Sequence, residues 1–547
     1  MYIPHLTKGR KMKKPLKIYY IIITLFVLFA CEQDDNLFEK AGPEIRSLIP
    51  VDIFKQERGL TVSLGIELRA ISGLNTLRVF KDGTLFDEVF YSEEQLLETY
   101  PFEYTVEELP DGSLIEFTFE LLDRAGERSS AFGFFVEVGP PFSIEEETIA
   151  GQNVQVVTGR INRDTTFRKE NIYIINGLVS VEGNKTLTIE PGTTILMRSF
   201  ENERDSRLAI TQGSRMNASG TKEAPIVFTS DRTLHGDADW GDWAGIFIYG
   251  RAPTNQASLV FEEGFTYGGN VDNDNSGQFK YIRIEYAGKN DADAIQFYGV
   301  GSSTEIAHLN VWSCFDNGVR FKGGSADLKY LVVIDHGAYG LWAEHGWRGR
   351  GQFWVFQTKI AATIVPINFN NIARSIELRN DGNDFNLQPA TYGRLANMTM
   401  IGNGNTDADG TRRGFRVRTG ARALAKNFIV TNFPDDGVRV EDVPESALQD
   451  GSMVIQHVRS FGNRSNFDEL AEDFYAPDPA FDVNDNTVPG IGPSDYVGSV
   501  PSPFDPANDP AFGSWFTSAP FIGAVESEEN DWTSDGNWVK NQDGTIR

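Results

Sequence analysis

Cysteine, histidine and long apolar runs are scarce in this chain of 547 residues. Its two cysteines cannot build a disulfide framework, and its six histidines show no H-x-H or H-E-x-x-H spacing, which argues against a zinc site. No apolar run reaches the roughly 20 residues that a membrane-spanning helix needs. Basic residues are also outnumbered, 50 against 77 acidic. With a net charge of −27, the protein is not attracted to nucleic acid or to anionic surfaces through its overall electrostatic field.

The longest apolar run ends at Ala30 and follows the basic segment Met12-Lys13-Lys14. A basic start, a short apolar run and a small residue before a cleavage point are typical of a secretory signal. Leu28-Phe29-Ala30-Cys31 resembles the lipobox of bacterial lipoproteins, although Phe29 is bulkier than that motif usually carries. We therefore interpret residues 1–31 as a lipoprotein signal peptide, translated from Met1 or Met12, with lipid on Cys31. An ordinary signal peptide with an incidental cysteine is the alternative.

Residues 32–43 form an acidic linker that opens with Glu32, Gln33, Asp34 and Asp35. An acidic cluster behind a lipidated cysteine resembles the surface-export signal of Bacteroidetes lipoproteins. This resemblance implies an outer-membrane protein, held in the lipid bilayer through Cys31 and facing the cell exterior. A plain solvated linker is the alternative. Cys314 would then lack a disulfide partner, and its place in LNVWSCFDNG indicates a buried or turn thiol.

Residues 44–139 contain short alternating runs that are separated by turn sequences such as Lys81-Asp82-Gly83-Thr84. Asp-Gly between alternating runs indicates β-hairpins, and about 100 residues of hairpins predict a β-sandwich. The layout resembles an immunoglobulin-like or fibronectin type III-like module. Gly139-Pro140-Pro141 makes a stiff break before the next domain, so we expect this module to act as a spacer.

A repeat with a period of 22 residues dominates the rest of the chain. Leu309, Leu331 and Phe353 lie 22 residues apart, and Val311, Val333 and Val355 repeat the same spacing. Runs this short that alternate apolar with other residues are strands, and strand repeats of this length stack as a solenoid. The sequence therefore predicts an all-β protein whose second domain, residues 150–540, is a right-handed parallel β-helix with these six residues pointing inward.

Several motifs resemble exported Bacteroidetes lipoproteins that carry a right-handed parallel β-helix of the pectate-lyase-like fold. They are LTIEPGTTI (187–195), AGIFIYGRAPTN (244–255), DNDNSGQFKYIRIEYAG (272–288), FYGVGSSTEIAHLNV (297–311) and FIGAVESEENDWTSDGNW (521–538). The resemblance implies the fold and export, but no established reaction and no catalytic residues. Residues 231–278 and 463–515 are long insertions, and we expect Phe521, Trp532 and Trp538 in the tail to cap the open end of the stack.

The residues that alternate along the strands with the predicted inward residues are also unusually apolar. The alternation places Trp312, Val332, Ile334, Trp354 and Phe356 on the outside of the stack. An exported protein does not leave such a face bare, so an insertion or the tail covers it, or it binds a ligand. Exposed tryptophans stack on sugar rings, so a glycan is the ligand expected in the second case, at Trp312 and Trp354.

A turn followed by a strand recurs with an outward arginine. Asp316-Asn317-Gly318-Val319-Arg320 is echoed by Asp435-Asp436-Gly437-Val438-Arg439, and Arg416 lies 23 residues before Arg439. Stacked arginines bind the carboxylates of acidic sugars, whereas in the alternative they pair with Asp435, Asp436 or Glu441. A corner histidine can serve as a general base or be structural. The candidate groove therefore comprises Arg320, Arg416, Arg439, His336, Asp316, Asp435, Trp312 and Trp354.

Calcium is the metal that the sequence favours. Asp272, Asp274 and Ser276 follow the start of an oxygen-ligand loop, but position 12 of that loop is Arg283 and so excludes an EF-hand. Asp407 and Asp409 form a second string of this kind. Both strings are also ordinary turn sequence.

These features predict a surface lipoprotein without catalytic activity that binds carbohydrate or another cell-surface component. The alternative is a β-helix polysaccharide lyase or glycoside hydrolase that acts on an acidic glycan. Hydrolases need clustered acids, and no three acids align here. A purely structural or adhesive module is a third interpretation.

Overall fold

The computed structural model describes residues 42–47, 53–91, 95–110, 112–201, 205–256, 260–262, 265–358, 374–404, 412–468, 471, 475–476, 491 and 495–547. Cys31, the acidic residues 32–35, Asp407 and Asp409 lie outside this part of the chain. The described residues divide between Gly139 and Pro140 into two compact units, each of which is described by itself. Within the described ranges, no helix has the length and apolar character needed to cross a membrane.

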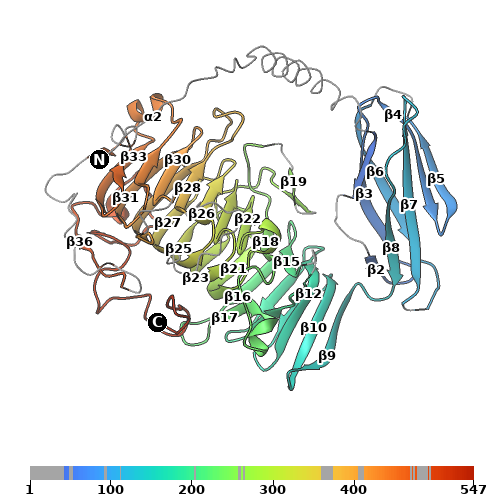
Figure 1. The fold of residues 1–547 in the computed structure, drawn as a ribbon, viewed down its shortest axis with the longest axis horizontal. Coiled ribbons are helices and arrows are strands. Elements are labelled where there is room, and N and C mark those ends of the chain that lie inside the picture. Colours follow the sequence, from blue (N-terminus) through green and yellow to red (C-terminus); the bar gives the residue numbers. More distant parts are fainter. Residues whose placement is uncertain are drawn as a thin grey trace, which may run out of the picture. The chain divides into compact units, whose positions relative to one another are not determined.

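The N-terminal unit is built from two sheets (Figure 1). Alternate residues of its strands are buried, as in Thr61–Arg69, so each sheet turns one apolar face inward. Phe102, Phe117 and Phe134 meet there with ring centroids 4.8 to 5.8 Å apart, so the unit is a β-sandwich. The first sheet has the order β1 (Glu44–Ser47), β3 (Thr61–Arg69), β6 (Leu97–Thr105), and the second β2 (Ile53–Gln56), β8 (Phe132–Val138), β7 (Leu114–Asp123), β4 (Leu74–Lys81), β5 (Thr84–Phe90).

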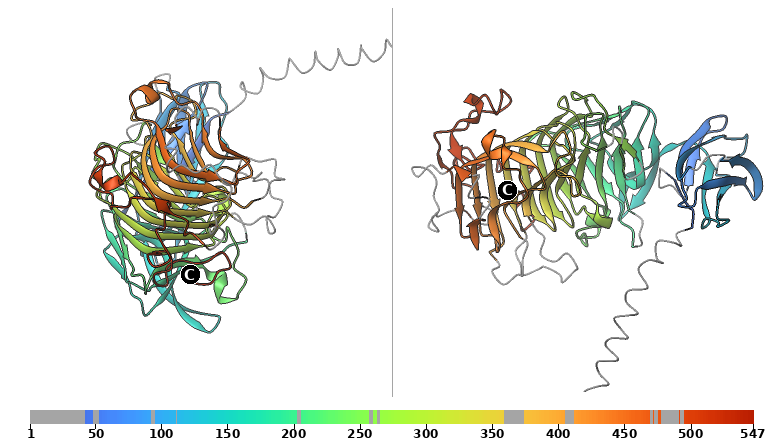
Figure 2. Two further views of the ribbon diagram at one scale, coloured as in Figure 1. Left: turned by 90° about the vertical axis from the view of Figure 1, so that its left-hand side faces the viewer. Right: turned by 90° about the horizontal axis from the view of Figure 1, so that it is seen from above.

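The second unit is a parallel β-helix, which confirms the predicted fold (Figures 1 and 2). It begins with β9 (Phe142–Ile149), which pairs antiparallel with β10 and covers the first coil. Its early strands are β10 (Gln152–Ile161), β11 (Thr165–Phe167), β12 (Ile172–Val181), β13 (Thr186–Ile189), β14 (Thr194–Met197), β15 (Arg207–Ile210), β16 (Arg215–Ser219), β17 (Ile226–Ser230) and β18 (Gly245–Tyr249), with η1 (Asp231–Leu234) after β17 and the hairpin β19 (Val260–Glu262) and β20 (Phe265–Tyr267) after β18.

From β21 onward each coil contributes one long and one short strand, and each kind pairs in parallel with its own kind. The long strands are β21 (Gly277–Glu285), β23 (Glu305–Cys314), β25 (Leu328–His336), β27 (Arg350–Gln357), β29 (Tyr392–Ile401), β31 (Arg422–Thr431) and β33 (Val454–Phe461). The short strands are β22 (Ile295–Tyr298), β24 (Val319–Lys322), β26 (Tyr339–Glu344), β28 (Arg374–Arg379), β30 (Phe415–Arg418), β32 (Asp436–Val440) and β34 (Ser465–Phe467). The remaining elements are η2 (Lys289–Asp291), α2 (Ser446–Gln449), β35 (Tyr475–Ala476), β36 (Val500–Pro501), η4 (Pro506–Asn508) and β37 (Phe521–Ile522).

The inward columns follow the predicted register as far as β25. Leu309 pairs with Leu331 and Val311 with Val333, and all four side chains are fully buried in the core. In the next coil Leu331 pairs with Trp354 and Val333 with Phe356, so the prediction of inward Phe353 and Val355 is wrong by one residue. The step from β25 to β27 is 23 residues rather than 22. Because strand side chains alternate, that single residue exchanges the two faces.

Each long strand bends at a residue with a left-handed backbone. Tyr281, His308, Tyr330 and Phe353 have φ between +48° and +62°, and their rings stack with centroids 4.1, 4.4 and 4.9 Å apart. Asn397, Asn427 and His457 take the same conformation in later coils. Left-handed backbone costs non-glycine residues energy, which ring stacking and amide hydrogen bonds offset at this corner.

The C-terminal tail covers the outer apolar face of the long strands. Val332 and Ile334 are fully buried in a cluster that includes Trp538 and Val539, and the indole of Trp312 donates to the carbonyl of Asn541 at 2.9 Å. The alternative in which the tail covers this face is thus confirmed for these residues. Trp354 and Phe356, predicted on the same face, lie in the core instead.

The tail runs along the side of the stack and does not close its end. Trp538 packs against Tyr281, Trp532 against Tyr330 and Phe521 against Phe353. The prediction that Phe521, Trp532 and Trp538 cap the open end is therefore wrong. The physical reason is that the tail buries its own apolar side chains against the apolar outer face of the long strands, which includes Val332 and Ile334.

Truncation of Leu331 to Ala tests the register. Leu331 is fully buried between Leu309 and Trp354, so the cavity left behind should lower the free energy of unfolding by about 2–5 kcal/mol. The measurement is chemical denaturation at pH 7. Val271→Ala, at a position 39% exposed, is the control and should change stability by less than about 0.5 kcal/mol. Equal effects of both substitutions would contradict the inward placement of Leu331.

Candidate functional site

The outward residues of the short strands form one column of charged and aromatic side chains. Arg320 pairs with Trp342, Trp342 with Glu377, Glu377 with Arg416, and Arg416 with Arg439. We call this column and the charged groups bound to it the charged ladder. Parallel coils set neighbouring members one strand spacing apart, about 4.8 Å, so each charge lies within reach of the next coil. The prediction that Arg416 and Arg439 stand one coil apart is confirmed.

Arg320 sits between two buried acids. Its Nε and Nη2 donate to one oxygen of Glu344 at 3.2 and 2.6 Å, and its Nη1 lies 3.5 Å from Asp293. Glu344 accepts from the Nε of Arg379 at 3.0 Å through its other oxygen, and Asp293 accepts from the amide of Asn317. Neither acid has any exposed surface. Their charges are therefore neutralised inside the protein rather than by solvent.

Trp342 lies among the cations of this cluster. The guanidinium of Arg320 is 3.9 Å from its ring centroid and that of Arg379 is 4.6 Å away. Such distances give cation–π attraction, which is stronger where water is excluded. The ring of Tyr339 lies 4.9 Å away at 48°, and the buried Nε1 of Trp342 has no hydrogen-bond partner. Trp342 thus keeps one unused donor.

Glu377 joins three arginines from two coils. One of its oxygens accepts from Arg374 at 3.0 Å and from Arg416 at 3.1 Å, and the other accepts from Arg418 at 2.7 Å. Glu377 has no exposed surface. Buried charge is stable only when it is paired and hydrogen-bonded, and Glu377 meets both conditions.

The last coils repeat this arrangement with other acids. Arg416 donates to Glu441 at 2.9 Å through its Nε, and Arg439 donates to Asp436 at 2.8 Å and also contacts Glu441. Asp435 pairs with Arg413 at 2.7 Å. The alternative in which Arg416 and Arg439 pair with nearby acids is confirmed, and Arg320 pairs in the same way.

The two acids around Arg320 have pKa values that are shifted in opposite directions. Burial raises the pKa of Asp293 to about 6, against the opposing charge of Arg320. Burial also acts to raise the pKa of Glu344, but the charges of Arg320, His345 and Arg379 outweigh it and lower that pKa to about 2. Two acids with separated pKa values are what acid–base catalysis requires. Their complete burial keeps substrate away from both.

The other predicted groove residues do not join the charged ladder as a group. His336 ends a long strand and is buried, so it cannot project as a base, and Trp354 lies in the core. Trp312 lies under the tail. Asp316 is buried and accepts from the amide of Asn317, which also binds Asp293. Of the predicted set, only the arginines, Asp316 and Asp435 lie in or beside the charged ladder.

The first predicted calcium loop binds protein groups. Asp272 pairs with Arg348 at 3.2 Å, Asp274 accepts from the backbone N–H of Arg251 at 3.1 Å, and the backbone N–H of Ser276 donates to Thr304. Across the described ranges, no three His, Cys, Asp or Glu side chains gather to hold a metal ion.

Sequence reasoning missed the acids that organise the charged ladder. Asp293, Glu344 and Glu377 each bind at least one arginine of the column, yet none was a candidate. The sequence did contain a signal for Trp342, because this residue lies 22 residues after Arg320, which is the same step as between the inward residues of neighbouring coils. Glu377 had none, since 35 residues separate it from Trp342.

Acid should destabilise the protein through His336. Burial lowers the pKa of His336 to about 4, whereas an unfolded histidine has a pKa of about 6.5. Between these values the unfolded chain binds a proton that the folded chain does not, so stability falls as pH drops from 6.5 towards 4. His336→Gln should therefore reduce the loss of unfolding free energy between pH 7 and pH 5 by about 2 kcal/mol.

Denaturation curves at the two pH values measure this effect. His235→Gln, which replaces an exposed histidine, is the control and should leave the pH dependence unchanged. If His336→Gln has the same pH dependence as the unmodified protein, His336 is not neutral in the folded state.

The match to a known protein family lies within the β-helix unit. Residues 159–488 match the family profile described as a pectate-lyase like beta helix domain. A family 28 exopolygalacturonase of Yersinia enterocolitica aligns with 80% of this chain and 98% of its own, at 9% identity and a TM-score of 0.17. The pectate lyase Pel3 of Pectobacterium carotovorum aligns with 79% and 99%, at 10% identity and a TM-score of 0.13. TM-scores this low carry no argument about function. The search of curated proteins gave no significant match.

Proposed function

The chain belongs to the family of pectate-lyase-like β-helix domains, and from this premise we propose that it is a non-catalytic member that binds carbohydrate at the cell surface. In this proposal Cys31 carries lipid in the outer membrane and the acidic residues 32–35 direct the protein to the cell exterior. The β-sandwich is an immunoglobulin-like spacer, and the charged ladder of the β-helix is the surface that meets the ligand.

The pairing of the arginines is the observation that supports a non-catalytic role. A lyase that acts on a uronate needs a cation free to face its substrate, but Arg320, Arg416 and Arg439 each bind at least one carboxylate. A hydrolase needs two acids that reach the glycosidic bond, but Asp293, Glu344 and Glu377 have no exposed surface. The arginines and the acids neutralise each other within the protein.

The same arrangement is suited to binding neutral or weakly charged sugars. Paired guanidinium and carboxylate groups hold donors and acceptors in fixed positions, which is what sugar hydroxyl groups recognise. Tyr339 and Trp342 are only partly buried and border the ion pairs. The Nε1 of Trp342 is buried, so the partly exposed ring is the group of this residue that a sugar can contact.

A glycoside hydrolase is the second candidate, and one observation favours it. Asp293, with a pKa of about 6, and Glu344, with a pKa of about 2, are bridged by Arg320. A proton donor and an ionised partner are the pair that glycoside hydrolysis uses. Motion that opened both acids to solvent would be needed, and for that reason we rank this function second.

Replacement of Trp342 tests the carbohydrate-binding surface. Trp342→Ala removes the partly exposed ring that Arg320 and Arg379 contact, so we expect affinity for a ligand found on a glycan array to fall at least about tenfold. Tyr392→Ala, on long strand β29, is the control and should bind normally. Glycans that bind both variants equally would contradict the placement of the surface.

The same proteins should release no product from polygalacturonate, measured as reducing ends and as ultraviolet absorbance of unsaturated uronates. Cleavage that Asp293→Asn or Glu344→Gln abolishes would establish the hydrolase instead.

The anchor is tested by fractionation of cells that express the whole chain. Cys31→Ser removes the acylated thiol, so the protein should leave the membrane fraction and become soluble. Cys314→Ser is the matched control, because Cys314 is fully buried and should not affect fractionation. Membrane retention of Cys31→Ser would refute the lipid anchor.

A further inference from the structure

The chain runs through the N-terminal β-sandwich from one end to the other. Its first strand begins at Glu44, which pairs with Arg69, and Arg69 pairs with Leu97. We call this the proximal end. At the opposite, distal end Leu114 pairs with Glu137, directly before the unit closes at Gly139. The segment from Cys31 therefore joins the sandwich at the proximal end, and the segment to the β-helix leaves from the distal end.

Exposed apolar side chains gather at the proximal end. Phe90 is 69% exposed, Leu97 59%, Ile71 56% and Leu96 55%, the four largest exposed fractions among large apolar residues of the described part. Phe90 belongs to the same end because it pairs with Thr76, two residues after the start of β4. The distal end also carries exposed apolar side chains, with Leu114 54%, Leu85 51% and Leu60 46% exposed, so the proximal end is distinguished by its place beside the segment that leads from Cys31.

The segment that carries Ile71 and the segment that carries Leu96 and Leu97 lie side by side and line a cavity. The backbone N–H of Ala70 donates to the carbonyl of Leu96 at 2.9 Å, and that of Leu74 donates to the carbonyl of Gln95 at 2.7 Å. The cavity has a volume of about 380 Å³ and is lined by Arg46, Glu67, Arg69, Ala70, Ile71, Leu96 and Leu97.

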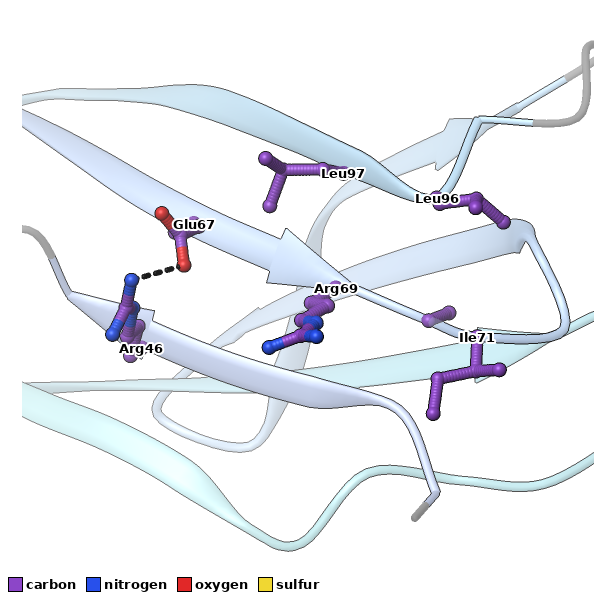
Figure 3. Close-up of a pocket in the computed structure, with 7 residues that line it drawn as sticks. Arg46, Glu67, Arg69, Ile71, Leu96 and Leu97 are labelled. Atoms are coloured by element: carbon purple, nitrogen blue, oxygen red, sulfur yellow. Dashed lines mark ion pairs between the residues drawn. The ribbon is translucent and has the colours of Figure 1, made fainter. Parts of the chain in front are cut away.

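Figure 3 shows Arg69 between the Arg46–Glu67 ion pair, 2.6 Å long, and the apolar side chains of Ile71 and Leu96. Within the described part of the chain, Arg69 makes no ion pair. A free guanidinium beside exposed aliphatic groups is suited to a phosphate above an apolar layer.

We propose that the proximal end of the sandwich rests on the surface of a phospholipid bilayer, with Phe90, Ile71, Leu96 and Leu97 in the interfacial layer and Arg69 at a lipid phosphate. This inference rests on the lipid anchor at Cys31 proposed above. Only the 12 residues 32–43 lie between Cys31 and Glu44, so the anchor holds this end within about 45 Å of the membrane. The apolar side chains then find the bilayer at high effective concentration.

The net charge of the chain indicates which lipid headgroups the proximal end can contact. At a net charge of −27 the protein is not attracted to anionic lipid through its overall field, so the contact depends on apolar insertion. Zwitterionic phosphatidylcholine should therefore be bound at least as well as a mixture with phosphatidylglycerol.

The test uses the chain from residue 32 to 547, which keeps both units and lacks the lipid, and phosphatidylcholine vesicles sedimented with bound protein. The unmodified chain should cosediment. The fourfold variant Ile71→Ser, Phe90→Ser, Leu96→Ser, Leu97→Ser should bind at least about tenfold more weakly, because each apolar side chain contributes to interfacial binding. The double variant Leu60→Ser, Leu114→Ser is the control, since these residues are 46% and 54% exposed but lie at the distal end.

Three outcomes would overturn the inference: no binding by the unmodified chain, equal loss in the distal control, or a dimer in solution that the fourfold variant abolishes while vesicles stay unbound. Circular dichroism of each variant verifies folding, and Arg69→Gln alone, which removes no apolar group, should weaken binding a few-fold. Because no lipid is attached in this assay, its result is independent of the Cys31→Ser fractionation, so failure of the membrane contact and failure of the anchor are distinguishable.

Discussion

Parallel coils stacked one strand spacing apart place each residue directly beside its counterpart in the next coil, and this constraint governs the whole second unit. Inward positions must be apolar in every coil, as Leu309 and Leu331 are. Corner positions must tolerate the same left-handed backbone, which rings and amides stabilise by stacking. Outward charges need partners of opposite sign within reach, because like charges at this distance repel: Arg416 and Arg439 are direct neighbours, and both contact Glu441. Glu377, which pairs with Arg374, Arg416 and Arg418, meets the same requirement for the coil before.

The charged ladder concentrates cations on a chain that is acidic overall. Glu344 and Glu377 each hold arginines from different coils, so these acids tie neighbouring coils together in addition to the backbone hydrogen bonds. Because these contacts are buried, removal of either partner would leave an isolated buried charge, which destabilises the fold. The result is a rigid polar surface, and rigidity is useful for recognition because no side-chain entropy is lost on binding.

Much of the β-helix was predictable from the sequence because its signal is periodic. The columns of Leu309 and Val311 and the spacing of Arg416 and Arg439 follow from a constant step between coils. Prediction failed where the step changes: one extra residue before Trp354 exchanged the two faces of that strand. It also failed for partners supplied from outside the repeat. Asp293 precedes a short strand, and the tail residues that cover Val332 lie about 200 residues away along the chain. Contacts between distant segments leave no local pattern.

The path of the tail also sets an order of assembly. Lys222 meets Asp535 at 2.8 Å across 313 residues of sequence, and Trp538 meets Tyr281 in a later coil. Contacts over such a distance in sequence form slowly, so we expect the tail to dock after the coils have stacked. Until then Trp312, Val332 and Ile334 face solvent and form a surface on which another chain can aggregate. Loss of the residues from 496 onward would uncover Trp312, Val332 and Ile334 along one side of the stack, so the tail shields the coils from contact with other chains.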